Sequence, residues 1–161
     1  MFIEVKKLND KAKLPCRATA DSAGADLCAC INDDIALMPG ERRLIPTGIA
    51  IAVPTGFGGF VFPRSGLSSK FGVSLANCVG VIDSDYRGEV KVPVINHSSE
   101  PYTIKAGERI AQLAIMPVDL CEYGFSDELD KTERGEGGFG STGSMSVSYT
   151  HLRAHETSQD L

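Results

Sequence analysis

The sequence NCVGVIDSDYRG, from Asn77 to Gly88, joins a strand pattern to a tight turn. Successive side chains of an extended segment point to opposite faces, so Val79, Val81 and Asp83 are predicted to share one face. A carboxylate therefore stands at the end of an apolar row, where we expect it to be partly shielded from water. Shielding of that kind makes a carboxylate a better base.

A turn is predicted directly after Asp83. Ser84 and Asp85 are residues that turns favour, Gly88 tolerates a positive φ, and apolar residues alternate again over Glu89 to Val94. The whole stretch is therefore predicted to be a β-hairpin with Asp83 at its bend.

The bend has two interpretations. Asp83 can be an ordinary turn former that bonds its own backbone. Alternatively, Asp83 belongs to a site together with Tyr86 and Arg87, because a carboxylate, an aromatic ring and a guanidinium can serve proton abstraction, stacking and phosphate binding.

The chain has 161 residues, which is enough for one domain with a single core. Its net charge of -5 argues against a partner that is a nucleic acid or a membrane surface, because such binders carry a basic patch. Five cysteines without a CxxC pair predict reduced thiols, and hence the cytoplasm or, in a eukaryote, the nucleus.

Outward from the bend, the chain again predicts strands. No window of a dozen residues has the apolar period of a helix. We expect an all-β fold, a barrel or sandwich, with at most one short helix. The expected strand segments are Phe2 to Leu8, Ala25 to Cys30, Met38 to Pro54, Gly56 to Phe62 and Ile104 to Pro117, and the expected helix lies near Gly66 to Phe71.

Three regions are predicted along the chain. Residues 1–117 form a core, residues 118–143 form an acidic and then Gly-rich flexible arm, and residues 144–161 are a disordered or non-native tail. The arm lacks a second apolar face that could pack on the core. A flexible linker would also explain its glycines, but Phe139 within it suits stacking on a planar ring.

Two further segments place small residues around a cation. In PRSGLSSK, Arg64 stands beside Ser65 and Gly66, which suits phosphate oxygens, although a structural turn would explain the same residues. Arg109 and Gln112 are three apart on a strand, so they are predicted to face opposite sides and only one is expected to reach a site.

Together these groups predict a nucleoside triphosphate as ligand. Cations would bind the phosphates, aromatic rings would contact the sugar and the base, and carboxylates would serve a metal ion and a water molecule. These residues are, in that order, Arg64 and Arg134, Tyr86 and Phe139, and Asp26 and Asp83.

The chain resembles the homotrimeric dUTP diphosphatases, or dUTPases, through five motifs in order. They are AGADLCA (Ala23 to Ala29), PRSGLSSK (Pro63 to Lys70), NCVGVIDSDYRGEV (Asn77 to Val90), AGERIAQL (Ala106 to Leu113) and RGEGGFGSTG (Arg134 to Gly143). Each motif alone is weak, but five in register are highly specific.

The resemblance implies a distorted β-barrel of jelly-roll type that forms a homotrimer, with active sites shared between chains. It implies hydrolysis of dUTP to dUMP and pyrophosphate with Mg²⁺, which keeps uracil out of DNA and supplies dUMP for thymidylate synthesis. Asp83 would activate the water that attacks the α-phosphorus, and Asp26 would hold Mg²⁺ through water.

The resemblance also assigns the substrate contacts. Uracil would be read by Asn77, Gly80, Val81 and Ile82, with Phe139 stacked over it and Tyr86 under the deoxyribose. The phosphates would be bound by Arg64, Ser65, Gly66, Gln112, Arg134, Gly140 and Ser141.

The sequence leaves three rival functions open. A dCTP deaminase shares the fold, but deamination relies on a Glu near the base, where this chain has Asp83. A non-catalytic nucleotide sensor on the same scaffold would predict a broken carboxylate or arm. A structural jelly roll, such as a coat protein, would leave the clustered Gly, Arg and Ser residues unexplained.

Overall fold

A computed structural model describes residues 1–141, 143 and 144 of the chain. The chain divides into two units, Met1–Cys121 and a second unit that begins at Glu122. The predicted boundary between core and arm follows residue 117, where the last strand ends, whereas the two units divide after Cys121. The predicted tail lies outside the described residues except for Ser144.

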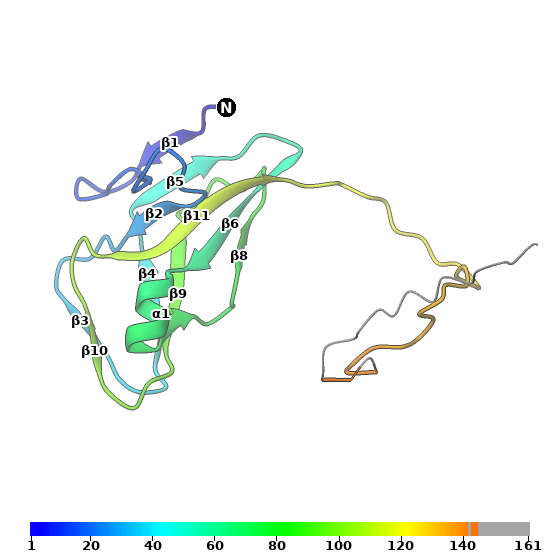
Figure 1. Ribbon diagram of the computed structural model, residues 1–161. Helices are drawn as coiled ribbons and strands as arrows, with labels where there is room; N and C mark the ends of the chain where they lie inside the picture. Colours follow the sequence, from blue (N-terminus) through cyan, green and yellow to red (C-terminus); the bar gives the residue numbers. More distant parts are fainter. Residues whose placement is uncertain (142, 145–161) are drawn as a thin grey trace, which may run out of the picture. The chain divides into compact units, whose positions relative to one another are not determined.

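Regular structure is confined to the first unit within the part of the chain that the structure describes (Figure 1). The strands are β1 (Glu4–Lys7), β2 (Ala25–Cys28), β3 (Ile35–Leu37), β4 (Arg42–Pro46), β5 (Ile49–Ala52), β6 (Phe57–Pro63), β7 (Val73–Leu75), β8 (Gly80–Ile82), β9 (Lys91–Asn96), β10 (Tyr102–Ile104) and β11 (Arg109–Pro117), and the helix is α1 (Ser65–Phe71). The predicted all-β fold with one short helix is therefore confirmed.

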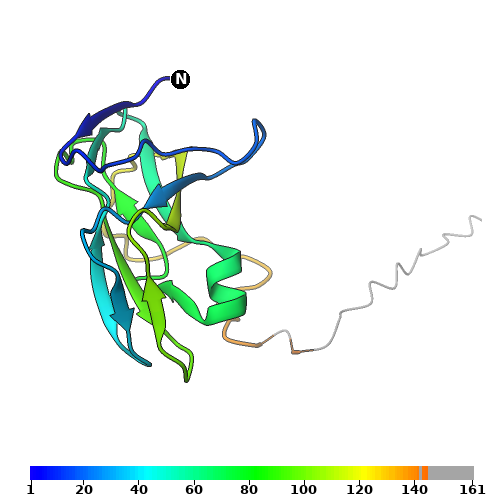
Figure 2. The ribbon, with the colours of Figure 1, turned by 90° about the vertical axis from the view of Figure 1, so that its left-hand side faces the viewer.

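The strands pair into four antiparallel sheets. The largest has the order β2-β11-β6-β8, the second has the order β4-β9-β7, and β1-β5 and β10-β3 are two-stranded. Figures 1 and 2 show the β1-β5 pair and the β3-β10 pair at opposite ends of the first unit. These sheets do not close into a complete barrel, which agrees with a distorted jelly roll.

Alternating apolar residues build the core between the sheets. Val92 and Val94 of β9 are fully buried, whereas Lys91 on the same strand is exposed. Burying one such side chain stabilises the fold by about 1.5–3 kcal/mol. Helix α1 adds Leu67 to this core and ends at Gly72, whose φ of 67° only glycine adopts without strain.

The predicted β-hairpin around Asp83 is wrong. Strand β8 pairs with β6, whereas β9, which follows the bend, pairs with β4 and β7 in another sheet. The bend therefore carries the chain from one sheet to another. The alternation of apolar residues predicted both strands correctly, but such a pattern does not encode which strand each one pairs with.

The five cysteines are all free thiols. Cys28 lies on β2 beside the core, and burial is the main cause that raises the pKa of its thiol. A raised pKa keeps the thiol protonated and unreactive, as expected for a cysteine that packs. Among the described residues, helix α1 is far shorter than a membrane-spanning helix must be.

Candidate active site

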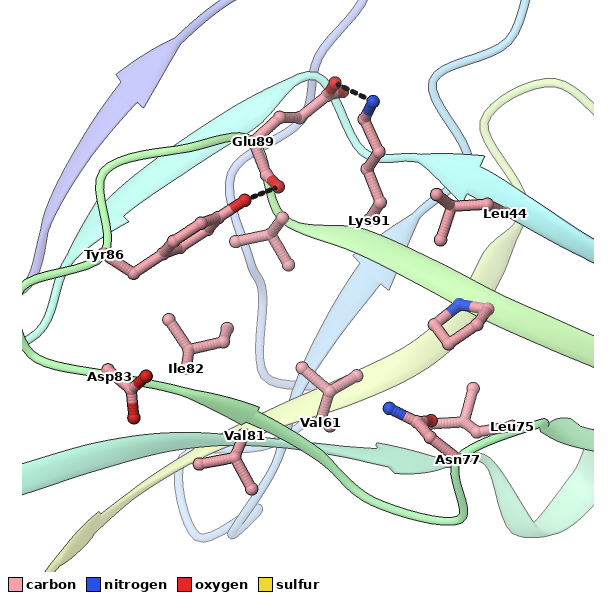
Figure 3. A pocket seen from close by; sticks show the side chains of 13 residues that line it. Leu44, Val61, Leu75, Asn77, Val81, Ile82, Asp83, Tyr86, Glu89 and Lys91 are labelled. Atoms are coloured by element: carbon pink, nitrogen blue, oxygen red, sulfur yellow. Dashed lines mark hydrogen bonds and ion pairs between the residues drawn. The ribbon is translucent and has the colours of Figure 1, made fainter.

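A pocket of about 360 Å³ lies beside the bend and gathers six of the residues that the sequence predicted (Figure 3). It is formed mainly by β8, the bend after it and the start of β9. The predicted residues that line it are Asn77, Gly80, Val81, Ile82, Asp83 and Tyr86, and the other lining residues include Leu44, Val61, Leu75, Glu89, Lys91 and Pro93.

Strand β8 presents backbone groups to this pocket because it lies at the edge of its sheet. Gly80 and Val81 pair with Val61 and Phe60 of β6, and among the described residues no strand pairs with the opposite side of β8. An edge strand offers N–H and C=O groups that can pair with a planar ligand. A Cβ atom at Gly80 would lie 3.2 Å from the Cβ of Val61, which explains the glycine.

The Asp83 carboxylate is unpaired within the described part of the chain. The chain leaves the sheet after the buried Ile82, and the Tyr86 N–H donates to the Asp83 carbonyl over 3.2 Å, which closes the turn. In contrast to the turn-former interpretation, no described residue forms a hydrogen bond or ion pair with the Asp83 side chain. Asp83 can therefore accept a proton from a ligand or a water molecule.

The apolar row before Asp83 does not shield it in the single chain. Val79 is 38% exposed, Val81 is 64% exposed, and Asp83 is exposed as well. The expected partial desolvation of Asp83 is therefore wrong for this unit by itself. The alternation is as predicted, but the valine face points outward, and Ile82 faces the core instead.

The ring of Tyr86 is fixed at the rim of the pocket. Its hydroxyl donates to the Glu89 carbonyl over 3.0 Å, as Figure 3 shows. A Cβ atom at Gly88 would lie 2.5 Å from Cζ of the ring. Gly88 is therefore required for the close approach of Tyr86, and not for a positive φ, which it does not have.

A second pocket, of about 370 Å³, gathers the residues predicted to bind phosphates and metal. Arg64, Ser65 and Gly66 line it where α1 begins, and Asp26 and Gln112 line it from β2 and β11. The first N–H groups of a helix have no partner within the helix, so those of Ser65 and Gly66 can bind an anion.

Two guanidinium groups engage the carboxylate of Asp26. Nε of Arg64 lies 3.0 Å from Oδ1, and Nη1 of Arg109 lies 3.0 Å from Oδ2. Arg64 also donates to the Arg109 carbonyl over 3.1 Å. This closed cluster places two positive charges around one negative charge, so the pocket keeps a net positive charge for an anion.

The prediction that Arg109 and Gln112 face opposite sides is wrong, because both line the second pocket. A β-bulge between Arg109 and Ala111 shifts the register of β11 against β2. The extra residue of the bulge offsets the alternation of side chains, so that residues three apart in the sequence point to the same face. The sequence contained one indication of this bulge, because Ile110 and Ala111 are two consecutive apolar residues. In the structure both are buried.

Gly24 is a further residue of this pocket that the sequence interpretation missed. A Cβ atom there would lie 2.5 Å from Oε1 and 3.1 Å from Cβ of Gln112. The amide of Gln112 donates to the Pro63 carbonyl over 2.9 Å and is held in place by that bond. Gly24 therefore leaves the space that Gln112 occupies.

The remaining predicted residues belong to the second unit. Arg134 donates from Nε to the Gly137 carbonyl over 2.6 Å, and Phe139, with a φ of 49°, is fully exposed. Gly140 and Ser141 follow in the same exposed turn. The predicted site residues thus fall into three groups. Two groups line pockets that have no lining residue in common, and the third belongs to the arm in the second unit.

A family model described as dUTPase matches residues 10–143. The chain belongs to the dUTPase family. A deoxyuridine 5'-triphosphate nucleotidohydrolase of Desulfitobacterium hafniense is 57% identical over 136 residues, which cover 83% of this chain and 90% of the relative.

Solved dUTPase structures agree with the fold. A Staphylococcus bacteriophage 80alpha dUTPase mutant with dUpNHpp has a TM-score of 0.77 and 30% identity, over 89% of this chain and 99% of that chain. A mutant dUTPase of phage phi11, described for the coordination of a structural Mg(II) ion, has a TM-score of 0.72 and 26% identity, over 80% of this chain and 98% of that chain.

Membership of the dUTPase family makes the chain a hydrolase that acts on dUTP. The dCTP deaminase, nucleotide-sensor and coat-protein alternatives are not favoured. Among the described residues, no group of three or more His, Cys, Asp or Glu side chains could hold a metal ion alone. A Mg²⁺ ion bound mainly through waters and phosphate oxygens would not require such a group.

Proposed function

We propose that Asp83 is the general base of dUTP hydrolysis. The observation that carries this role is the contrast between two carboxylates, since Asp26 is held by two guanidinium groups and Asp83 is unpaired at the edge of the first pocket. Asp83 would take a proton from a water molecule, whose oxygen attacks the α-phosphorus. The bond to the bridging oxygen breaks, and dUMP and pyrophosphate leave.

The first pocket is proposed to bind deoxyuridine. The unpaired edge of β8, from Gly80 to Ile82, would pair with the polar edge of uracil, assisted by Asn77. The methyl group of thymine would lack room in so close a fit. Tyr86 would lie under the deoxyribose, where a 2′-hydroxyl would collide with its ring.

The second pocket is proposed to bind the triphosphate. Arg64, Ser65, Gly66 and Gln112 supply cationic and amide donors there, and Arg109 adds charge. A bound Mg²⁺ would neutralise charge on the phosphate oxygens. Asp26 would orient a water of that ion, because a carboxylate has more lone pairs than its two arginine contacts use.

The complete site is proposed to form between copies of the chain in a homotrimer. One support is that the two pockets share no lining residue. Another is that the arm, with its glycines and Phe139, belongs to the second unit and not to the unit that holds the pockets. The phosphate pocket of one chain would face the uracil pocket of a second chain. The arm of a third chain would add Arg134, Gly140 and Ser141 to the phosphates and stack Phe139 on uracil.

Hydrolysis of a nucleotide panel with Mg²⁺ tests the proposal. Pyrophosphate release should be fast with dUTP and slower by orders of magnitude with dTTP, dCTP and UTP, because the pocket reads both base and sugar. Ammonia release from dCTP would instead establish a deaminase. Equal turnover of dUTP and UTP would remove Tyr86 from its proposed role.

A further inference from the structure

The ring of Tyr86 is held by the backbone of Glu89, which is in turn held by residues outside the motif Asn77 to Val90. The acceptor of its hydroxyl is the backbone carbonyl of Glu89, at 3.0 Å. The position of the ring therefore depends on the position of the Glu89 backbone. What fixes that backbone is the turn between β4 and β5, at Thr47 and Gly48.

Three hydrogen bonds join this turn to the segment after Tyr86. The Gly48 N–H donates to Oε1 of Glu89 over 2.9 Å, and the Val90 N–H donates to the Ile49 carbonyl over 2.8 Å. The buried hydroxyl of Thr47 donates to the Val90 carbonyl over 2.5 Å. The second oxygen of Glu89 faces Lys91 at 3.7 Å.

We infer that Glu89 is a positioning residue, which fixes the ring of Tyr86 through the Gly48 turn and so sets the preference for deoxyribose over ribose. This inference rests on the proposed function of the first pocket. Both Tyr86 and Glu89 line that pocket, and Figure 3 shows the Glu89 carboxylate directed away from the ring, toward Lys91. Glu89 therefore acts on the sugar through Tyr86 and not by contact.

A single hydroxyl distinguishes the two sugars, so the exclusion of ribose depends on how firmly the ring of Tyr86 is held in place. Gly88 has no side chain to confine the ring, and the ring hydroxyl has one hydrogen bond among the described residues. Loss of the Glu89 side chain would remove the hydrogen bond by which its carboxylate holds this backbone against Gly48.

Glu89→Ala and Glu89→Gln are the informative variants. The first removes the acceptor of the Gly48 N–H, and the second keeps an acceptor oxygen but removes the charge that faces Lys91. Glu41→Ala is the matched control, because Glu41 also accepts a turn N–H, from Met38 at 2.9 Å, and pairs with the cation two residues later. Glu41 lines neither pocket.

The readouts are kcat/KM for dUTP and UTP, the affinities of dUMP and UMP by titration calorimetry, and thermal stability. For Glu89→Ala the preference for deoxyribose should fall about tenfold, the worth of roughly one hydrogen bond. Glu89→Gln should restore most of it, and Glu41→Ala should retain it even where its stability falls equally.

An unchanged preference in Glu89→Ala, in a wild type that does prefer dUTP and dUMP, would overturn the inference. An equal loss in Glu41→Ala would do the same, because the effect would then follow stability alone. A wild type that prefers neither deoxynucleotide would instead overturn the proposed function of the pocket. The affinities of dUMP and UMP, measured by calorimetry, separate these outcomes from any defect in catalysis.

Discussion

At the scale of single residues, the two carboxylates of the motifs differ in what surrounds them. Asp26 is 14% exposed and pairs with Arg64 and Arg109 through both oxygens. Asp83 has an exposed side chain that no described residue engages. The proposed roles follow from this difference, because a carboxylate without protein partners can approach a water molecule, whereas one that two arginines hold in place is suited to positioning.

Asp83→Asn should lower kcat for dUTP by about 10² to 10⁴, the usual contribution of a general base. The fold should be retained, because the Asp83 side chain forms no hydrogen bond or ion pair with any described residue. Steady-state kinetics measure the effect, and calorimetry with dUMP should give an affinity near that of the wild type. Near-normal turnover in this variant would remove Asp83 from the mechanism.

Glu41 gives the chain a pH-dependent contribution to stability. Its hydrogen bond from the Met38 N–H, and then its contact with Arg43, lower the pKa of the carboxyl below 4.5. A lowered pKa in the folded state stabilises the fold above pH 4.5, and this stability is lost as the pH falls through the folded pKa.

We therefore expect Glu41→Gln to be less stable than the wild type at pH 7 and equal to it at strongly acidic pH. Urea unfolding at a fixed protein concentration, followed by circular dichroism, measures the difference. A difference that stays constant from pH 7 to pH 3 would contradict the assignment.

At the scale of secondary structure elements, the bulge in β11 organises the second pocket. It brings Arg109 and Gln112 to one face, opposite Asp26 of β2. The last residue of β6, Pro63, accepts the Gln112 amide and is followed by Arg64. Three neighbouring strands of one sheet thereby bring donors from distant parts of the chain into one pocket.

Gly24→Ala should disturb this pocket with little change in stability. The added methyl group would lie 2.5 Å from Oε1 of Gln112 and displace the side chain from Pro63. We expect KM for dUTP to rise by about tenfold, the worth of roughly one hydrogen bond. Gly124→Ala is the control, because no atom lies within 4 Å there. An unchanged KM would exclude Gln112 from phosphate binding.

Truncation before Arg134 tests the arm as an element. The sheets and helix of the first unit end at Pro117, so we expect the truncated chain to unfold at nearly the wild-type temperature. Most dUTP hydrolysis should be lost, because the proposed stacking and phosphate contacts of the arm are removed. Full activity of the truncated protein would show that the arm is only a linker.

At the scale of the whole molecule, one chain carries all the proposed parts of the site but divides them. The uracil pocket and the phosphate pocket have different lining residues, and Phe139 and Arg134 belong to the second unit. The exposed side chains of Val79, which precedes β8, and of Val81 within β8 would become buried if another copy covered them. This arrangement is what a site shared between copies requires.

Mixing two inactive variants tests the sharing directly. Asp83→Asn supplies an intact arm, and the chain truncated before Arg134 supplies an intact Asp83. After the mixed subunits are unfolded and refolded together, some sites should combine both intact parts, and activity should reappear. Sedimentation should give a mass of three chains. No recovery from a mixture that does form mixed trimers would show that each site is built within one chain.

The sequence alone determined the family, the short helix and most strand segments, because alternation, turn residues and contiguous motifs are local properties. It missed the short strands β3, β7 and β10, and it gave β4 and β5 as one segment. The tertiary structure decided that β8 and β9 belong to different sheets, that a bulge brings Arg109 beside Gln112, and that Gly88 is required by Tyr86. It also distinguished the unpaired Asp83 from the paired Asp26. These features depend on strand register and on contacts between residues distant in the chain, which packing of the whole core sets and a local pattern does not encode.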